Sequence, residues 1–206
     1  RNLILLDGVP VYNVDHLLGF FSVFTPEAVK KVTLFKSSFP ARFGGRLSSV
    51  IDVRTNDGDM KNYHGVVSVG LLTSKINFEG PIIKNRTSFN ISARRSYIDL
   101  LAKPFMPKDE KYSYYFFDVN AKINHKFSDR SRLFLSAYNG KDHFMTKYDD
   151  TYYGDEDKYR DGGKMNWGNT IVSGRWNYIF NNKLFSNTTV AFNNYKFDVS
   201  TYTKNE

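Results

Sequence analysis

The pattern of hydrophobic and polar positions divides the chain into two parts. In residues 1–58, short apolar runs are separated by turn residues, whereas from about His64 apolar and polar residues alternate over long stretches. Such alternation is typical of β-strands with one apolar and one polar face. The sequence therefore predicts a small N-terminal unit followed by a large antiparallel sheet.

The N-terminal unit is predicted to mix short strands with one short helix. Thr25 is a suitable N-cap and Pro26 a suitable first helical residue, so a helix is expected from Pro26 to about Lys31. Asp7-Gly8 predicts a tight turn, and Gly44-Gly45 predicts a second turn where only glycine fits. Strands are expected at Leu3–Leu6, Val32–Phe35 and Ser49–Arg54.

The clearest alternation in the second part runs from residue 115 to residue 127. Arg95 interrupts the apolar face of an earlier strand, which predicts a bulge or a position near a membrane interface. Leu184 begins a last strand-like segment whose alternation is weak. The predicted apolar face carries Tyr115, Phe117, Val119, Ala121 and Ile123, and, on a later strand, Val172, Trp176, Tyr178 and Phe180. The predicted polar face carries Asp118, Asn120 and Lys122, and on the later strand Arg175 and Asn177.

The connections between the predicted strands alternate in length. Short polar turns occur at residues 84–86, 128–130 and 181–183, and long loops at residues 102–111 and 147–164. Outer-membrane barrels combine short periplasmic turns with long external loops. A soluble all-β protein with one wet face stays open as an alternative.

Composition narrows the class of protein further. The 206 residues include 18 Phe, 14 Tyr and 2 Trp, yet the mean hydropathy is negative and no apolar run of about 18 residues occurs. A transmembrane β-strand needs only about 9–11 residues, with every second one apolar. There is no cysteine, which excludes disulfides and thiolate metal sites. No signal peptide precedes the first apolar run, so we expect that either the chain is processed or its start is missing.

The excess of basic over acidic residues is compatible with several kinds of partner. The formal charge is +8, which suits nucleic acid, an acidic membrane surface or an acidic ligand. Single-stranded nucleic acid would require aromatic and basic residues interleaved on one face. Here the aromatic residues lie on the apolar faces and the polar faces carry mixed charge, so no nucleic-acid partner is expected.

Three segments resemble the plug of TonB-dependent outer-membrane receptors: Leu5–Tyr12, Pro26–Lys36 and Pro40–Thr55. The resemblance implies a mainly β fold, in which a partial transmembrane antiparallel β-barrel is preceded by a small α/β plug unit. Residues 1–58 would be the C-terminal part of the plug, and residues 59–206 the first about seven strands of the barrel. Outer-membrane transporters of this kind have roughly 22 strands, so most of the barrel would follow this chain.

Two shorter segments add to the resemblance, and two features depart from it. Phe78–Pro81 and Ser92–Tyr97 also resemble the family, whereas Ser37 stands where the family often has glycine. The segment from Arg42 to Val53 resembles most the subgroup with an upstream carboxypeptidase-regulatory-like domain. A glycan substrate therefore does not follow.

The resemblance implies active, TonB-energised uptake of a scarce nutrient across the outer membrane of a Gram-negative bacterium. The implied partners are the TonB complex, reached through an N-terminal segment upstream, a surface lipoprotein, outer-membrane lipid and the remaining strands of the same parent chain. A passive outer-membrane porin is the main alternative, and a soluble all-β binding protein is a further one. A porin would have no separate unit ahead of its strands.

Charged residues of the N-terminal unit are candidates for contact with the barrel wall, because a buried charge must be paired or hydrated. Arg42, Arg46, Asp52 and Arg54 are expected to pair with wall residues such as Glu79, Arg94 and Asp118. Asp7, Gly8, Gly44 and Gly45 are the predicted plug turns. The segment from Asp149 to Asp157, called the acidic loop, is rich in acids and tyrosines. It is expected to be either a solvated external loop or a weak substrate-capture site formed by Asp149, Asp150, Tyr152, Tyr153 and Asp155.

No pattern in the sequence predicts catalysis or a bound cofactor. His16, His64, His125 and His143 lack metal-ligand spacing, and no serine nucleophile elbow occurs. The acidic loop does not match the calcium-binding EF-hand pattern. Gly44-Gly45 is not followed by the Lys-Ser/Thr of a phosphate-binding loop. We therefore expect neither an enzyme nor a metal site.

Overall fold

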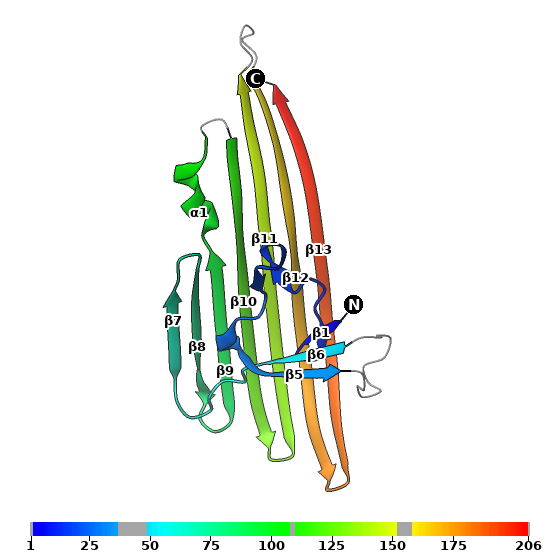
Figure 1. Ribbon diagram of the computed structural model, residues 1–206. Helices are drawn as coiled ribbons and strands as arrows, with labels where there is room; N and C mark the ends of the chain where they lie inside the picture. The colour runs from blue at the N-terminus through cyan, green and yellow to red at the C-terminus, as the bar shows by residue number, and fades with distance from the viewer. Residues whose placement is uncertain (1, 37–48, 108–109, 152–157, 206) are drawn as a thin grey trace.

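The computed structural model describes residues 2–36, 49–107, 110–151 and 158–205, and these residues are mainly β (Figure 1). None of their helices is both long and apolar enough to cross a membrane. The N-terminal unit contains β1 (Leu3–Leu6), β2 (Val9–Pro10), β3 (Asp15–His16), η1 (Leu17–Gly19), β4 (Phe21–Ser22), η2 (Pro26–Ala28), β5 (Val29–Lys36) and β6 (Ser49–Thr55).

A small sheet with the strand order β2-β1-β6-β5 forms the body of the N-terminal unit. β1 runs parallel to β6 and antiparallel to β2. The turn between β1 and β2 is the predicted Asp7-Gly8 pair, and both residues have positive φ, 50° and 88°. Two consecutive positive φ angles make the tight hairpin turn whose twist matches that of the strands, and Asp-Gly is a favoured pair for it.

The predicted helix after Thr25 is shorter than expected. The structure has a 3-10 helix, η2, that ends at Ala28, and β5 begins at Val29. Thr25 makes no side-chain cap. From Val29 onward the backbone pairs with β6, and the β-branched residues Val32 and Thr33 fit this extended conformation well.

Within the described residues, seven strands form a large antiparallel sheet in which each strand pairs with its sequence neighbours. The predicted mainly β fold with an antiparallel, barrel-like sheet is therefore confirmed. The large sheet comprises β7 (His64–Val69), β8 (Thr73–Ile83), β9 (Thr87–Ser96), β10 (Glu110–Ser128), β11 (Ser131–Thr151), β12 (Lys158–Asn181) and β13 (Leu184–Asn205); α1 (Ile98–Ala102) and η3 (Lys103–Phe105) connect β9 to β10.

One detail of the large sheet differs from the predictions, and two others make them more specific. Of the two alternatives predicted for Arg95, the bulge is absent, because β9 keeps its register with both neighbours there, and the position near a membrane interface stays a prediction. The loop expected at residues 147–164 is mostly strand, since β11 continues to Thr151 and β12 begins at Lys158. The weakly alternating last segment is one continuous strand, which pairs with β12 over nearly its whole length. At the ends of β11 and β12 and along β13, pairing with the neighbouring strand keeps the backbone extended although the alternation of side chains is weak.

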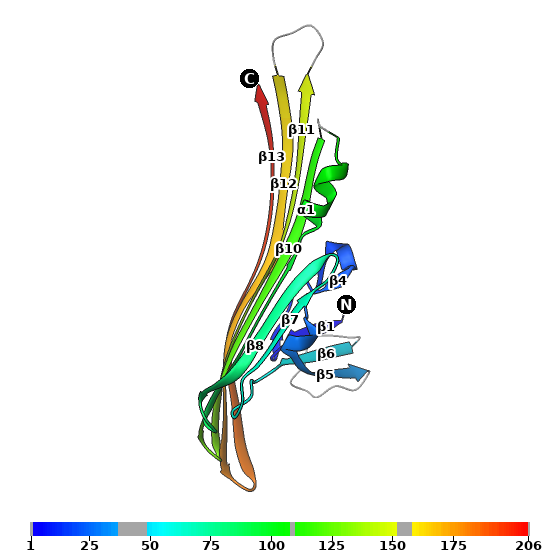
Figure 2. The same ribbon diagram turned by 90° about the vertical axis from the view of Figure 1, so that its left-hand side faces the viewer.

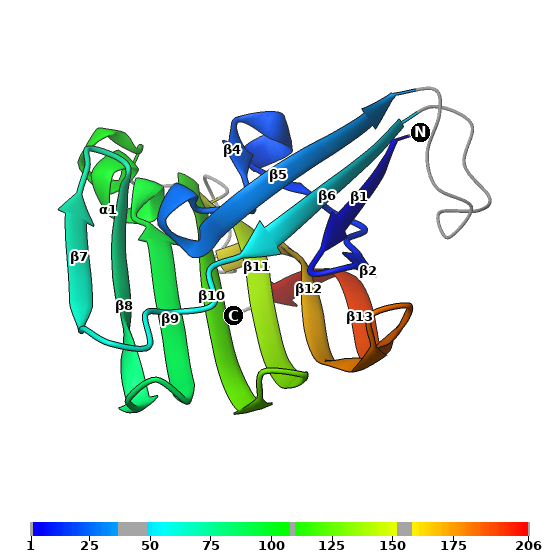
Figure 3. The same cartoon turned by 90° about the horizontal axis from the view of Figure 1, so that it is seen from below.

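The N-terminal unit lies against one face of the large sheet. Seen from below, the seven strands form an open arc with the small sheet on its inner side, and β5 and β6 cross the long strands steeply (Figures 1 and 3). The side view shows all blue and cyan N-terminal elements on the same side (Figure 2). A hydrophobic cluster joins the two: Val23 and Val53 from the N-terminal unit with Tyr138 and Ile171 from the large sheet.

The faces of the large sheet are inverted relative to those of a soluble protein. The inner face, beneath the N-terminal unit, buries polar side chains: Ser88, Asn90, Ser92, Arg94, Asp118, Asn120, Lys122, Asn124, Asp142 and Asn169. The outer face exposes apolar ones: Val119 is 40% and Phe180 52% exposed, and Ile91, Leu135, Val172 and Trp176 lie between these two values. The predicted division of β10 and β12 into an apolar and a polar face is confirmed.

Candidate functional site

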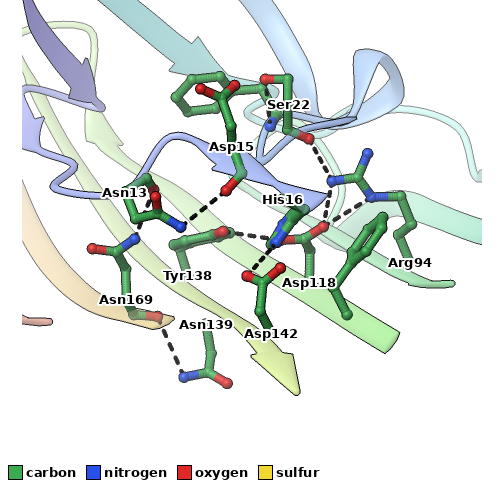
Figure 4. A network of polar contacts seen from close by, with 12 residues as sticks. Asn13, Asp15, His16, Ser22, Arg94, Asp118, Tyr138, Asn139, Asp142 and Asn169 are labelled. Atoms are coloured by element: carbon green, nitrogen blue, oxygen red, sulfur yellow. Dashed lines mark hydrogen bonds and ion pairs between the residues drawn. The ribbon is translucent and has the colours of Figure 1, made fainter. Parts of the chain in front are cut away.

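The interface between the N-terminal unit and the large sheet is organised around His16. The short strand β3 carries this residue to the inner face, where its side chain is 1% exposed (Figure 4). Its Nε2 lies 2.8 Å from Oδ1 of Asp118 on β10, and its Nδ1 lies 2.7 Å from Oδ2 of Asp142 on β11. His16 therefore bridges two adjacent strands of the large sheet.

This geometry determines the charge on His16. An ionised carboxylate only accepts hydrogen bonds, so both ring nitrogens must donate, which requires the imidazolium form. Burial alone would lower the pKa of His16, but the hydrogen bonds and charges of Asp118 and Asp142 outweigh it and raise the pKa above its usual 6.5. The raised pKa and the two hydrogen bonds to carboxylates both favour the cationic form of His16.

Further donors complete the coordination of the two carboxylates. Nε of Arg94, on β9, donates to Oδ2 of Asp118 over 2.8 Å, and its Nη2 donates over 2.6 Å to the carbonyl oxygen of Ser22 in the N-terminal unit. The hydroxyl group of Tyr138 donates to Oδ1 of Asp118 over 2.9 Å. Two cations and two carboxylates balance in charge, as a buried cluster requires.

Tyr114 and Phe116 enclose the cluster from β10. The Tyr114 hydroxyl donates to Asp142 and accepts the backbone N–H of Leu17 over 2.7 Å. The ring of Phe116 stacks on His16, with ring centroids 4.2 Å apart and planes 6° apart, and is fully buried. The guanidinium carbon of Arg94 lies 5.0 Å from the centroid of the same ring. The aromatic rings exclude water, which strengthens the ionic contacts.

A second ionic cluster centres on Lys122, which lies four positions after Asp118 on β10. Its Nζ lies 3.1 Å from Oδ1 of Asp7, 2.9 Å from Oδ1 of Asp57 and 3.0 Å from the carbonyl oxygen of Thr55. Burial alone would raise the pKa of Asp57, but Lys122 and Lys30 hold it below its usual 3.8. One wall lysine thus joins the turn after β1 to the end of β6.

Weaker polar contacts extend the interface on both sides of these clusters. The Asn169 side chain donates to the carbonyl oxygen of Asn13 over 2.8 Å (Figure 4). At the other side, Nζ of Lys75 lies 2.5 Å from Oε1 of Glu27. Every strand from β8 to β12 therefore contributes a hydrogen bond or ion pair to the N-terminal unit or to the segment that follows it.

The predicted contact residues have different positions in this interface. Arg94 and Asp118 lie together in the His16 cluster, and Glu79 accepts a hydrogen bond of 2.7 Å from Asn56. Asp52 and Arg54 form an ion pair of 3.0 Å with each other on β6. Asp7 binds Lys122, in addition to forming its turn with Gly8.

The remaining predicted site residues cannot be placed. Arg42, Gly44, Gly45 and Arg46, together with Tyr152, Tyr153 and Asp155, lie outside the described residues. The backbone of Asp149 and Asp150 belongs to β11, and their side chains are outside the described part of the structure.

Sequence reasoning missed His16, Asp142 and Lys122 as contact residues. His16 lacks metal-ligand spacing, and among the described residues no group of three or more His, Cys, Asp and Glu side chains could hold a metal ion. The pattern did carry one indication: Asp118 and Lys122 lie on the polar face of β10. Pairing of Asp118 with Gly140 then places Asp142 on the same face of β11.

No protein-family model matches the chain, and no curated protein sequence matches it. Among solved structures, it aligns over 93% of its length with 40% of the siderophore receptor PirA from Acinetobacter baumannii, at 13% identity and a TM-score of 0.46. It aligns over 97% of its length with 37% of a mutant of the ferric enterobactin receptor PfeA from Pseudomonas aeruginosa, at 12% identity and a TM-score of 0.47. The chain thus spans about two fifths of the receptors it matches, and the resemblance is one of strand arrangement.

Proposed function

We propose that the chain is part of an outer-membrane receptor that imports a scarce nutrient with energy supplied by TonB. Residues 1–58 act as part of the plug, and residues 59–206 form the first wall strands of the barrel. The observation that carries this proposal is the inverted large sheet, whose buried face is polar and whose exposed face is apolar. In water such a sheet would expose a large apolar surface, whereas in a membrane each face meets the environment that suits it.

The height of the apolar band on the outer face agrees with a membrane. The ten residue steps from Phe117 to Phe127 on β10, at about 3.3 Å each, cover about 33 Å along the strand. A strand tilt of about 40° reduces this to a height of about 25 Å, the usual apolar height of an outer-membrane barrel. The strands continue beyond the band on the side opposite the short turns, which is the external side in this proposal.

The contacts of the N-terminal unit explain why external energy would be required. Opening a path beside the large sheet means separating His16 from two carboxylates and Lys122 from two more. Removing one partner from a buried ion pair costs about 3–5 kcal/mol. A substrate shifts this equilibrium only by its different affinity for the closed and open states, so mechanical work from the TonB complex is the fitting source.

The partners follow from the same proposal. TonB would engage an N-terminal segment of the parent chain, lipid would cover the outer face, and further strands of the parent chain would pair with the free edges of β7 and β13, since lipid cannot satisfy exposed backbone groups. A surface lipoprotein is a further proposed partner. A passive porin is the competing function, and the docked N-terminal unit speaks against it.

The test uses any labelled nutrient whose cellular uptake requires the parent chain. We expect uptake to stop when TonB is deleted or the proton gradient is collapsed, while binding at the cell surface persists. Uptake at full rate in a TonB-deleted strain without another energiser would contradict the receptor and support the porin.

A further inference from the structure

A row of cations crosses the outer face of the large sheet. Register aligns one residue from each of six strands: Ser74 opposite Arg95, Arg95 opposite Phe117, Phe117 opposite Lys141, Lys141 opposite Gly168, and Gly168 opposite Lys196. Three of these residues are basic, and each is separated from the next by one strand. Since neighbouring strands lie about 4.8 Å apart, successive cations are about 10 Å apart. We call Arg95, Lys141 and Lys196 the basic row.

The basic row points away from the N-terminal unit. Side chains alternate between the two faces of a strand, and each cation is the sequence neighbour of an inner-face residue. Arg95 follows the buried Arg94, and Lys141 precedes the buried Asp142. Lys196 follows Tyr195, which pairs with the buried Asn169. The side chains of Arg95 and Lys196 are 50% and 74% exposed, and Lys141 is exposed as well. No substrate path on the inner face can use them.

Among the described residues, two cations of the basic row have an acidic neighbour and the third has none. Lys196 lies 3.2 Å from Asp198 in an exposed pair, and Arg95 lies 3.2 Å from Asp99, whose side chain is only 14% exposed. Lys141 has no ion pair among the described residues. An exposed pair such as Lys196 with Asp198 contributes little to stability.

Gly168 leaves the space between Lys141 and Lys196 open. A Cβ at this position would lie 2.2 Å from the carbonyl oxygen of Gly140 and 2.8 Å from Cγ of Lys141. No side chain can therefore stand between the two lysines, and an anion could contact both. Three more exposed lysines, Lys111, Lys147 and Lys164, occupy outer-face positions above the row.

The basic row lies at the upper boundary of the apolar band. Phe117 belongs to the row, with Val119 and Ile123 of the apolar band below it and the amphipathic Tyr115 next above it on the same face of β10. Lipid head groups meet the protein at this level if the apolar band spans the membrane, so the inference rests on the membrane placement in the proposed function. Basic groups at a membrane surface attract anionic head groups.

We propose that the basic row binds the phosphate groups of lipids in the external leaflet, with Lys141 and Lys196 holding one phosphate across Gly168. The apolar side chains below would contact the acyl chains of the same lipid. Such a bound lipid would fix the height and tilt of the wall strands in the membrane.

The experiment uses the full parent protein in phosphatidylcholine nanodiscs that contain either phosphorylated lipid A or its enzymatically dephosphorylated form. Heat-modifiable migration first shows that the protein has inserted; failure to insert would contradict the proposed function itself. The lipid A that remains with the protein after a detergent wash is then counted by mass spectrometry. We expect the wild type to retain the phosphorylated form preferentially.

The variants locate the site. K141Q/K196Q should lower retention of the phosphorylated lipid roughly 30-fold, because each basic group at a membrane surface contributes about fivefold in affinity. K141R/K196R should keep it, and so should K84Q/K183Q, which removes the same charge from the short turns at the other end of the strands. Equal retention of both lipid forms by inserted wild-type protein, or equal losses in K84Q/K183Q and K141Q/K196Q, would overturn this inference and leave the proposed function standing.

Discussion

Nζ of Lys122 lies 3.1 Å from Oδ1 of Asp7, although 115 residues separate the two in the chain. The lysine is 4% exposed and the aspartate 5%. The contact joins the first turn of the N-terminal unit to the middle of a wall strand. Such a pair can form only when both parts of the chain are folded and docked.

Replacing Lys122 with methionine should undock the N-terminal unit. The substitution keeps the length of the side chain but leaves Asp7 and Asp57 as buried carboxylates without their cation, at a cost of about 3–5 kcal/mol. Limited proteolysis of the detergent-solubilised parent protein should cut within residues 2–57 much faster than in the wild type. K126M, which removes a lysine paired with the 92% exposed Asp129, is the control and should behave as the wild type.

The docking of the segment around His16 should weaken at alkaline pH. A pKa that is raised in the docked state means that His16 binds its proton more tightly there than after release. Its stabilisation is therefore complete below the ordinary value of 6.5 and is lost as pH rises through the raised value. Asp118, Asp142, Arg94, Tyr114 and Tyr138 are the other titratable groups that face the ring.

A spin label at Asn13→Cys can follow this change, because the 206 residues contain no competing cysteine and any cysteine in the rest of the parent chain can be replaced. We expect label mobility in the parent protein to rise with pH above neutrality. H16Q cannot titrate, so in this background mobility should not depend on pH. Mobility that is constant with pH in the wild type as well would show that the imidazolium does not hold this segment.

Gly140 should not tolerate alanine. A Cβ at this position would lie 2.0 Å from the hydroxyl oxygen of Tyr138 and 2.8 Å from Oδ1 of Asp118, two members of the His16 cluster. Displacing them should cost about 1–3 kcal/mol of docking stability. G174A, on the outer face of β12 with its nearest neighbour at 3.5 Å, is the matched control and should be tolerated. Equal thermal stability of G140A and G174A would contradict this packing.

Leu135→Lys should distinguish a membrane wall from a soluble sheet. Leu135 is 47% exposed in the middle of the outer face, where a lysine near the centre of a bilayer costs about 2–4 kcal/mol. In a soluble protein the same surface change would usually cost less than about 0.5 kcal/mol. Folding yield into lipid vesicles reports the difference, and L71K, in the exposed turn between β7 and β8, serves as control.

The sequence predicts the architecture better than the site, for a physical reason. Alternation along β10 has a period of two, so it identifies both faces of the strand without knowledge of the fold. The helix after Thr25 was overestimated because pairing with β6 competes with local helix signals. Residues 147–164 look like a loop because their composition is polar, yet β11 and β12 pair up to Thr151 and Lys158.

The His16 cluster depends on distances that no local pattern contains. His16 lies more than a hundred residues from either carboxylate, and its role follows from how the N-terminal unit docks. The residues that the large sheet contributes to this cluster could be predicted in part, since Asp118 and Arg94 occupy polar-face positions in the sequence pattern. Asp52 and Arg54 were equally plausible from sequence, but they pair with each other on the same strand.

The central claim is that residues 1–58 help to fill a membrane pore whose wall includes the large sheet. Conductance of the full parent protein in a planar lipid bilayer tests it most directly. We expect the wild type to insert with little conductance, and a variant without residues 2–58 to form large, stable channels, with K122M in between. A wild type that conducts as freely as the deletion variant would contradict the account and favour a passive porin.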